Sequence, residues 1–217
     1  MYQVFPSLSF TDIVKKRLGE NALDSFNDYR LCSWLSHQED LHRMVFYIAD
    51  SRRNPSTPWT RRCLRQADCV VLLALASASD PSRLSPIEQA MSYLTAKVTK
   101  ILVLLYPLET EYPQVKRTAV WLNARPWVTQ HYHIRCPPRV LSPTAKNLIS
   151  FYSQVFLMEE PNPHSDMSRL ARYLSGQAVG LVLGGGGAKG GAHVGVLRVF
   201  QVRFYPISFF LTFFMYI

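Results

Sequence analysis

Runs of mostly apolar residues alternate with helix-like patterns along most of this chain. The runs predict buried strands at Met44–Ala49, Cys69–Ala76, Lys100–Tyr106 and Ala178–Leu183, with a weaker one at Val128–Ile134. Between them, apolar residues recur at near-helical spacing, which predicts helices over Ala22–His42, Gln89–Ala96, Gln114–Asn123, Pro143–Phe156, Asp166–Leu174 and Ala192–Phe200. Continuously apolar strands separated by helices are typical of a mostly parallel sheet, so the predicted fold class is α/β.

Two helix starts carry the same local signal. Thr57 precedes Pro58, and Ser85 precedes Pro86. A hydroxyl at the N-cap with proline at the first helical position favours a helix start, because the proline lacks an N–H that would be unpaired there. We therefore expect a short helix after Thr57 and another after Ser85.

A polar, proline-bearing stretch at residues 159–166 divides the chain. We predict a Rossmann- or flavodoxin-like accessory domain over residues 1–158, and a linker and helix over 159–177. The start of a second domain is predicted over 178–201, followed by an apolar tail over 202–217. That tail is shorter than the roughly 20 residues of a membrane-spanning helix. Residues 1–10 lack the basic and apolar regions of a signal peptide.

Charge and cysteine content exclude some partners and leave others open. The net charge of +9 fits an anionic membrane surface or an unbalanced charge in a piece of a larger protein. No motif interleaves aromatic and basic residues, so we expect no nucleic-acid partner. The cysteines lack zinc-site spacing, which favours reduced thiols; they are Cys32, Cys63, Cys69 and Cys136. We expect no cofactor, and the sequence indicates no oligomeric state.

Several side chains have both a functional and a plain structural interpretation. His131 and His133 share one face of a predicted strand and could bind a metal, but no third ligand lies nearby, which favours a surface strand face. His193 follows a glycine run, where helix packing is favoured over a catalytic base. A basic cluster could meet anionic headgroups or form a solvated helix start; it contains Arg52, Arg53, Arg61, Arg62 and Arg65.

The glycine run around residue 187 is the chemically most informative feature. It joins a predicted strand to a predicted helix, and bare backbone N–H groups there can hold a phosphate or an oxyanion. Gly185, Gly187 and Gly190 fit a dinucleotide fingerprint, but no acidic residue follows Asp166 to bind a ribose. A nucleoside-triphosphate loop needs Gly-Lys-Ser/Thr, whereas Lys189 is followed by Gly190. The oxyanion interpretation is therefore favoured.

The same run carries a family resemblance. Gly-Gly-Gly-Ala-Lys-Gly at 185–190 resembles the oxyanion motif of patatin-like phospholipases, and the wider sequence resembles their neuropathy target esterase branch, a group of lysophospholipases. Other matching stretches, within residues 10–201, are Trp34–Leu35, Gln38–Glu39, Pro58–Thr60, Cys63–Cys69, Trp121–Asn123, His164–Arg172, Leu181–Gly190 and His193–Leu197. The resemblance implies that residues 178–201 begin a patatin-like α/β hydrolase domain. The implied oxyanion-hole residues are Gly185, Gly186, Gly187, Ala188, Lys189 and Gly190.

The resemblance also implies a substrate and a location. Relatives of this kind hydrolyse carboxylic esters of lysophospholipids at a membrane surface, on the cytoplasmic face of the endoplasmic reticulum. Lys189 would orient the loop or meet a lipid phosphate; the alternative is a solvated lysine.

The family's catalytic Ser–Asp dyad is missing. The chain has no Gly-x-Ser-x-Gly and no Asp after Asp166. We therefore expect the chain as given to end inside the catalytic domain and to lack esterase activity. Resemblance stops at Val202-Arg203, whose codons can form a splice donor, so we hypothesise that residues 202–217 are translated intron. Two alternatives stay open: a non-catalytic membrane or protein interaction module, and a nucleotide-binding domain.

Overall fold

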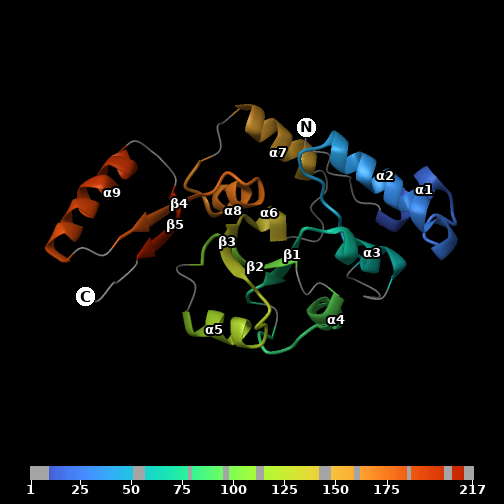
Figure 1. The fold of residues 1–217 in the computed structure, drawn as a ribbon, viewed down its shortest axis with the longest axis horizontal. Helices are drawn as coiled ribbons and strands as arrows, with labels where there is room; N and C mark the ends of the chain where they lie inside the picture. The colour runs from blue at the N-terminus through green and yellow to red at the C-terminus, as the bar shows by residue number, and fades with distance from the viewer. Residues whose placement is uncertain are drawn as a thin grey trace. The chain divides into compact units, whose positions relative to one another are not determined.

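The chain forms two compact units, Met1–Phe151 and Tyr152–Ile217. The computed structural model describes residues 10–50, 57–77, 80–94, 98–110, 115–141, 148–158, 162–184, 187–202 and 207–212 (Figure 1). The predicted domain boundaries at residues 158, 177 and 201 stay predictions.

Helices and strands alternate as the apolar pattern predicts. In chain order the elements up to the third strand are α1 (Phe10–Leu18), η1 (Ser25–Asn27), α2 (Asp28–Leu41), α3 (Pro58–Gln66), β1 (Cys69–Leu75), α4 (Pro86–Leu94), β2 (Thr99–Pro107), α5 (Val115–Asn123) and β3 (Gln130–Cys136). The remaining elements are α6 (Pro138–Leu141), α7 (Leu148–Met158), α8 (Asp166–Leu174), β4 (Val179–Leu183), η2 (Gly187–Gly191), α9 (Ala192–Val202) and β5 (Ile207–Thr212).

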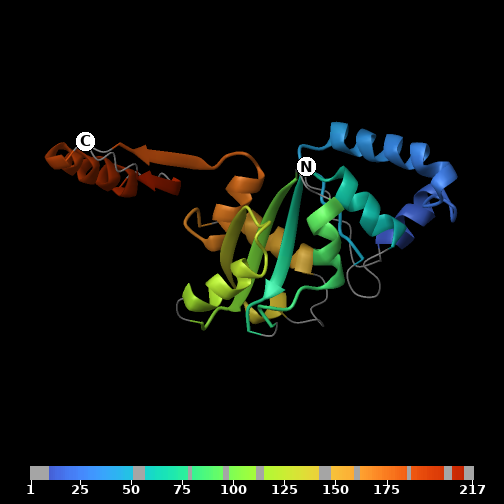
Figure 2. The ribbon, with the colours of Figure 1, turned by 60° about the horizontal axis from the view of Figure 1, so that its bottom comes forward.

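The first unit is built on a parallel sheet with the order β1-β2-β3. Leu72 of β1 is the register partner of Leu102 of β2, which in turn is the partner of His131 of β3. Consecutive strands are neighbours, so right-handed crossovers place α4 and α5 on the same side of the sheet, as Figure 1 shows. Figure 2 shows the three strands side by side. The α/β fold class with a parallel sheet is confirmed.

The central strand carries the core. Residues 101–104 of β2 are at most 1% exposed. On the α5 side, Leu102 and Leu104 form a cluster with Ala76 and Trp121. A second cluster joins the helices before the sheet and contains Val14, Ala22, Leu31, Leu35, Trp59 and Cys63.

The predicted strand at Met44–Ala49 is wrong, because the structure shows no strand over these described residues. Polar side chains hold the segment instead. Trp59 Nε1 donates to the Ile48 carbonyl at 3.0 Å, and the Asp50 N–H donates to Thr60 Oγ1 at 3.1 Å. Of this segment, Tyr47 packs against the cluster that contains Trp59, whereas Phe46 and Ile48 are 43% and 54% exposed. The segment therefore has no ladder partner, and an apolar run alone cannot distinguish this outcome from a strand.

Other boundaries move for local reasons. The helix predicted from Ala22 begins at Asp28, because Asp24 is extended (φ −74°, ψ 149°) and a 3₁₀ turn follows. Gln114 and residues 143–147 of two predicted helices lie outside the described residues. The short helices α1 and α6 were not predicted.

The second unit contains a parallel pair of strands joined through α9. β4 pairs with β5 in the register Val179↔Ile207 to Leu183↔Thr212, so the apolar tail contributes a strand. Within the described part of the chain, no helix has the length and apolar character needed to cross a membrane.

Candidate functional site

The glycine loop lies between β4 and α9. β4 ends at Leu183, and η2 runs directly into α9 at Ala192. Of the predicted oxyanion-hole residues, Gly187, Ala188, Lys189 and Gly190 belong to η2, whereas Gly185 and Gly186 lie outside the described residues. Gly187 has φ +52°, a left-handed conformation that a side chain disfavours, so glycine is required there.

His193 joins the two sides of this loop. Its Nε2 lies 2.9 Å from the carbonyl oxygen of Gly184. A carbonyl only accepts, so Nε2 carries the proton and donates it. The contact ties the ring of His193 to the residue before the glycine loop, which is a structural role, and it leaves Nδ1 as the unprotonated nitrogen of the neutral imidazole.

The loop can present donors to an anion. The first N–H groups of a helical segment lack intrahelical acceptors, and here they belong to Gly187, Ala188 and Lys189, all exposed. The helix dipole adds positive potential at the same end. An oxyanion or phosphate is the ligand that such a backbone favours.

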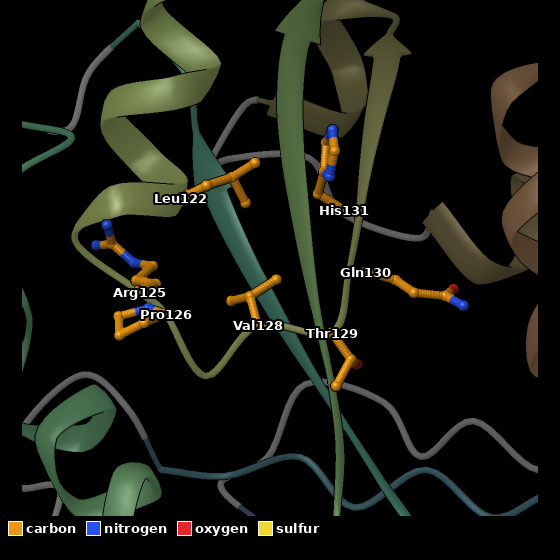
Figure 3. A pocket seen from close by; sticks show the side chains of 7 residues that line it. All are labelled: Leu122, Arg125, Pro126, Val128, Thr129, Gln130 and His131. Atoms are coloured by element: carbon orange, nitrogen blue, oxygen red, sulfur yellow. The ribbon is translucent and has the colours of Figure 1, made fainter.

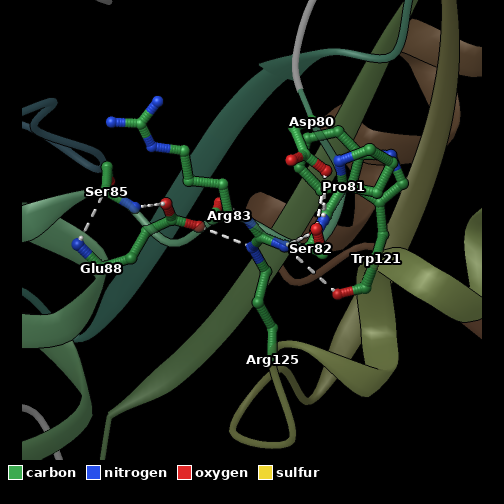
Figure 4. Close-up of polar contacts among 8 residues, drawn as sticks. All are labelled: Asp80, Pro81, Ser82, Arg83, Ser85, Glu88, Trp121 and Arg125. Carbon is green, nitrogen blue, oxygen red and sulfur yellow. Dashed lines mark hydrogen bonds and ion pairs between the residues drawn. The ribbon is translucent and has the colours of Figure 1, made fainter.

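The connection between β1 and α4 is the other place where a parallel α/β domain can bind an anion. Here a side chain occupies it: Arg125 Nη1 donates to the Pro81 carbonyl at 2.7 Å, and Nη2 donates to the Arg83 carbonyl at 3.0 Å (Figure 4). The Pro81 and Arg83 carbonyls of this connection therefore already accept hydrogen bonds from Arg125. The connection also contains no glycine, since Gly19 is the single glycine between residues 1 and 175.

Arg125 is anchored by a buried carboxylate. Its Nε lies 2.5 Å from Glu88 Oε1, and Glu88 Oε2 accepts from the Ser85 N–H at 2.6 Å. Sequence reasoning found the helix start at Ser85 but missed this network. The sequence contains the Ser85-x-x-Glu88 spacing of a capping box, which could have predicted the local part of the network. It contains no signal for Arg125, which lies 37 residues from Glu88.

A pocket of about 300 Å³ opens beside the end of α5 (Figure 3). It is lined by Leu122, Arg125, Pro126, Val128, Thr129, Gln130 and His131. Thr129 Oγ1 donates to the Lys100 carbonyl at 2.8 Å, so this hydroxyl ties β3 to β2.

The two predicted strand histidines do share a face of β3. Their ring centroids are 5.5 Å apart, and His133 Nδ1 lies 3.1 Å from the Tyr106 hydroxyl. His131 is exposed and His133 is half-buried. In the described ranges, no group of three potential metal ligands occurs.

The basic cluster is only partly described. Arg61 and Arg65 are exposed, Arg62 Nη1 lies 3.3 Å from Asp28 Oδ2, and Arg52 and Arg53 are outside the described residues. Arg62 thus forms an ion pair with Asp28 of α2. All four cysteines are free thiols.

Several family-like stretches near the N-terminus meet in one place. Leu35, Trp59 and Cys63 share the core cluster, and Trp34 packs against it. At its edge, Glu39 accepts from Tyr47 Oη at 2.6 Å and from Gln66 Nε2 at 3.1 Å. These residues hold α2 to α3, so their pattern has a structural role.

Comparison with known proteins identifies the family to which the chain belongs. The family model described as the Neuropathy Target Esterase family P-loop like domain matches residues 7–156. Neuropathy target esterase sws of Drosophila persimilis is 46% identical over 205 residues, which cover 94% of this chain and 14% of that protein. Patatin-like phospholipase domain-containing protein 7 of Rattus norvegicus is 48% identical over 199 residues, covering 91% and 14% respectively.

The chain thus spans about one-seventh of these relatives' length, 14% in each of the two. No solved structure matches it significantly. The matched model covers the three-stranded sheet and the helices around it, and the relatives extend the similarity over nearly the whole chain. The chain belongs to the neuropathy target esterase family, and its residues 7–156 are the P-loop-like domain of that family.

Proposed function

We propose that residues 178–201 are the beginning of a patatin-like hydrolase domain that cleaves carboxylic esters of lysophospholipids. The supporting observation is the strand–glycine loop–helix arrangement of β4, η2 and α9 in a chain 46% identical to a neuropathy target esterase. In this proposal the substrate is a lipid at a membrane surface, on the cytoplasmic face of the endoplasmic reticulum.

The loop would act as the oxyanion hole. A serine hydroxyl attacks the acyl carbonyl, and the carbonyl oxygen becomes negatively charged in the tetrahedral intermediate. Backbone N–H groups over Gly185–Gly190 would donate to that oxygen, and removing one such donor typically lowers the rate about 10²–10³-fold. His193 would keep the loop in shape through its hydrogen bond to the Gly184 carbonyl.

The 217-residue chain contains no Gly-x-Ser-x-Gly, so we propose that it has no esterase activity by itself. The first test is an assay of the purified chain with lysophosphatidylcholine. We expect no hydrolysis above the protein-free rate. Hydrolysis abolished by a serine-directed organophosphate would overturn this part of the proposal.

The oxyanion role is tested in a longer gene product. Sequencing of full-length transcripts should find one that joins Gln201 to an exon encoding Gly-x-Ser-x-Gly, and transcripts that only encode residues 202–217 would contradict the translated-intron hypothesis. In the longer product, Gly187→Ala should lower kcat because Gly187 has φ +52°. Gly195→Ala is the matched control, since a Cβ there meets no atom within 4 Å.

A non-catalytic interaction module is the second candidate. Its supporting observation is that the first unit has its own core, with Trp59, Leu102 and Leu104 all at 0% exposure. This candidate predicts a stably folded first unit that binds a partner in the absence of the hydrolase half. Vesicle flotation of the 217-residue chain distinguishes it from an inert fragment.

A further inference from the structure

The start of α4 is where a P-loop-like domain would hold a phosphate. A parallel α/β domain presents backbone N–H groups at a helix that follows a strand, and the helix dipole favours an anion there. Here α4 follows β1 through a connection of which residues 80–85 are described. Pro81 and Pro86 have no N–H, so two of the donors that a phosphate loop needs are missing.

Several backbone donors of this connection are already engaged. Asp80 Oδ1 accepts from the Ser82 N–H at 3.0 Å, and the Asp80 carbonyl accepts from the Arg83 N–H at 3.3 Å. At the helix start, the Ser85 N–H donates to Glu88 Oε2 at 2.6 Å, and the Glu88 N–H donates to Ser85 Oγ at 3.4 Å. The last two contacts form a capping box, so these donors are bound by the helix itself.

The Glu88 carboxylate has the contacts that a ligand anion would make. One oxygen accepts from the Ser85 N–H at the helix start, and the other accepts from Arg125 Nε at 2.5 Å (Figure 4). The side chains of Glu88 and Arg125 are 6% and 2% exposed, so both groups are shielded from water. Proteins use backbone N–H groups and arginine to bind phosphate and carboxylate ligands. An internal carboxylate therefore fills an anion-binding position.

Arg125 is also held by contacts that do not involve Glu88. Its Nη1 donates to the Pro81 carbonyl at 2.7 Å, and its Nη2 donates to the Arg83 carbonyl at 3.0 Å. Its guanidinium carbon lies 4.5 Å from the centre of the Trp121 ring, which is within the range of a cation–π contact. The guanidinium should therefore keep its place when the Glu88 carboxylate is removed.

Two further features of the first unit disfavour a nucleotide. Nucleotides bind parallel sheets in the crevice where the strand order reverses, and among the described strands the order β1-β2-β3 does not reverse. The connection and its partners also carry no excess positive charge for a polyphosphate. The two arginines, Arg83 and Arg125, are balanced by Asp80 and Glu88.

We propose that the Glu88 carboxylate is the internal ligand of the P-loop-like domain: it occupies the anion position at the start of α4, faces Arg125, and thereby excludes nucleoside phosphates. Without Glu88, the same position would take a small carboxylate, with Arg125 as its cationic donor. This position lies in the first unit, and it does not rest on the proposed esterase function.

The first test is a titration of the ¹⁵N-labelled 217-residue chain with ATP and Mg²⁺, with NAD and with inorganic phosphate. We expect the amide signals of Ser82, Ser85 and Glu88 to stay unmoved, because their internal acceptors remain bound. Shifts confined to residues 187–190 would belong to the glycine loop and would agree with this expectation. Saturable shifts of the Ser85 and Glu88 amides with any of the three probes would overturn the proposal.

Glu88→Ala tests the internal ligand directly. It removes the carboxylate but keeps the Arg125 guanidinium, the Ser85 N–H and a helix-forming residue. Acetate should bind in the vacated position, so the ratio of folded to unfolded chain should rise about tenfold at an acetate concentration ten times its Kd. Chloride at the same ionic strength should have no such effect. If the variant is unfolded without acetate, circular dichroism measures its refolding over the same acetate series.

Two variants control for unspecific effects of acetate. Glu109→Ala removes an exposed carboxylate that follows β2, and it should respond to acetate no more than the unmodified chain does. Glu88→Ala/Arg125→Met lacks the cation as well and should lose the response. The proposal is contradicted if Glu88→Ala, folded or unfolded, does not respond to acetate, or if the double variant responds as strongly as the single one.

Discussion

Arg125 and Glu88 form an ion pair inside the P-loop-like domain. Arg125 Nε lies 2.5 Å from Glu88 Oε1, and their side chains are only 2% and 6% exposed. The pair joins the connection before β3 to the first turn of α4 (Figure 4). The other Glu88 oxygen accepts from Ser85, and the Arg125 guanidinium also donates to the carbonyls of Pro81 and Arg83. Buried charges need such additional partners to be tolerated.

Removing one partner of this pair should strongly destabilise the first unit. Arg125→Met leaves Glu88 as an unpaired buried charge and frees the Pro81 and Arg83 carbonyls, so we expect the free energy of unfolding to fall by about 3–5 kcal/mol. Urea unfolding measures this change. Arg83→Met is the matched control, because Arg83 accepts from Arg125 through its backbone carbonyl, which the substitution keeps. We expect the free energy of unfolding of that variant to lie within about 0.5 kcal/mol of that of the unmodified protein.

The double variant Arg125→Met/Glu88→Leu refines this prediction. Because neither partner is then left charged and alone, it should recover part of the lost stability. A single variant Arg125→Met that unfolds at the same urea concentration as the unmodified protein would show that the pair contributes nothing to folding.

The N-cap of α3 supports a second prediction. Thr57 Oγ1 accepts from the Thr60 N–H at 3.1 Å, and the Thr57 hydroxyl donates to Thr60 Oγ1 at 2.8 Å. Thr57→Ala should lower the free energy of unfolding by about 0.5–2 kcal/mol. Thr57→Ser keeps the oxygen and should retain most of the stability, as measured by thermal unfolding. Equal losses in both variants would rule out the cap as the cause.

Alkaline pH should destabilise the fold through Cys63. Burial, with a smaller contribution from Asp50, raises the pKa of this thiol from 9.0 to about 12. Above pH 9 the unfolded chain loses the proton that the folded chain still holds, so stability that is complete below pH 9 is lost as the pH rises toward 12. Tyr47 acts in the same direction, because burial and Glu39 raise its pKa.

Urea unfolding at a series of alkaline pH values measures this dependence. Cys63 should contribute a slope of up to about 1.4 kcal/mol per pH unit. Cys63→Ala should make the curve flatter, whereas Cys32→Ala, a substitution of a half-buried thiol, should leave the slope unchanged. Identical slopes for Cys63→Ala and the unmodified protein would exclude Cys63 as a source.

Strands with continuous apolar runs could be predicted from the sequence, because burial on both faces leaves a local signature. Thr99–Pro107 is the clearest case, with residues 101–104 at most 1% exposed, whereas Cys69–Leu75 has the same apolar run although Leu73 and Leu75 are exposed. Met44–Ala49 has the same signature but no ladder, since Trp59 and Thr60 bond its backbone and that of Asp50. The outcome depends on side chains of another element, which a local pattern does not contain.

Of the candidate functional features, some could be predicted from the local sequence and others could not. The glycine loop was visible because glycines at fixed spacing between an apolar strand and a helix are typical of an anion-binding backbone. The His133–Tyr106 contact joins residues 27 apart and depends on the register of β2 against β3. The spacing of His131 and His133 predicts their common face but not the tyrosine beside them.

The pairing of β4 with β5 supports a prediction about the stability of the second unit. The two strands are parallel and joined by α9, and Val179 and Val182 of β4 are 57% and 61% exposed. A two-stranded sheet with exposed apolar residues is marginally stable, so β4 should depend on β5, its ladder partner among the described residues. Removing residues 203–217 should therefore abolish hydrogen-exchange protection of the β4 amides, whereas the amides of β2 should stay protected because the first unit has its own core. A matched variant that replaces residues 213–217 with a Gly/Ser segment keeps β5 and should preserve the protection of β4. Unchanged exchange of β4 in the shortened chain would mean that β5 adds nothing to the second unit.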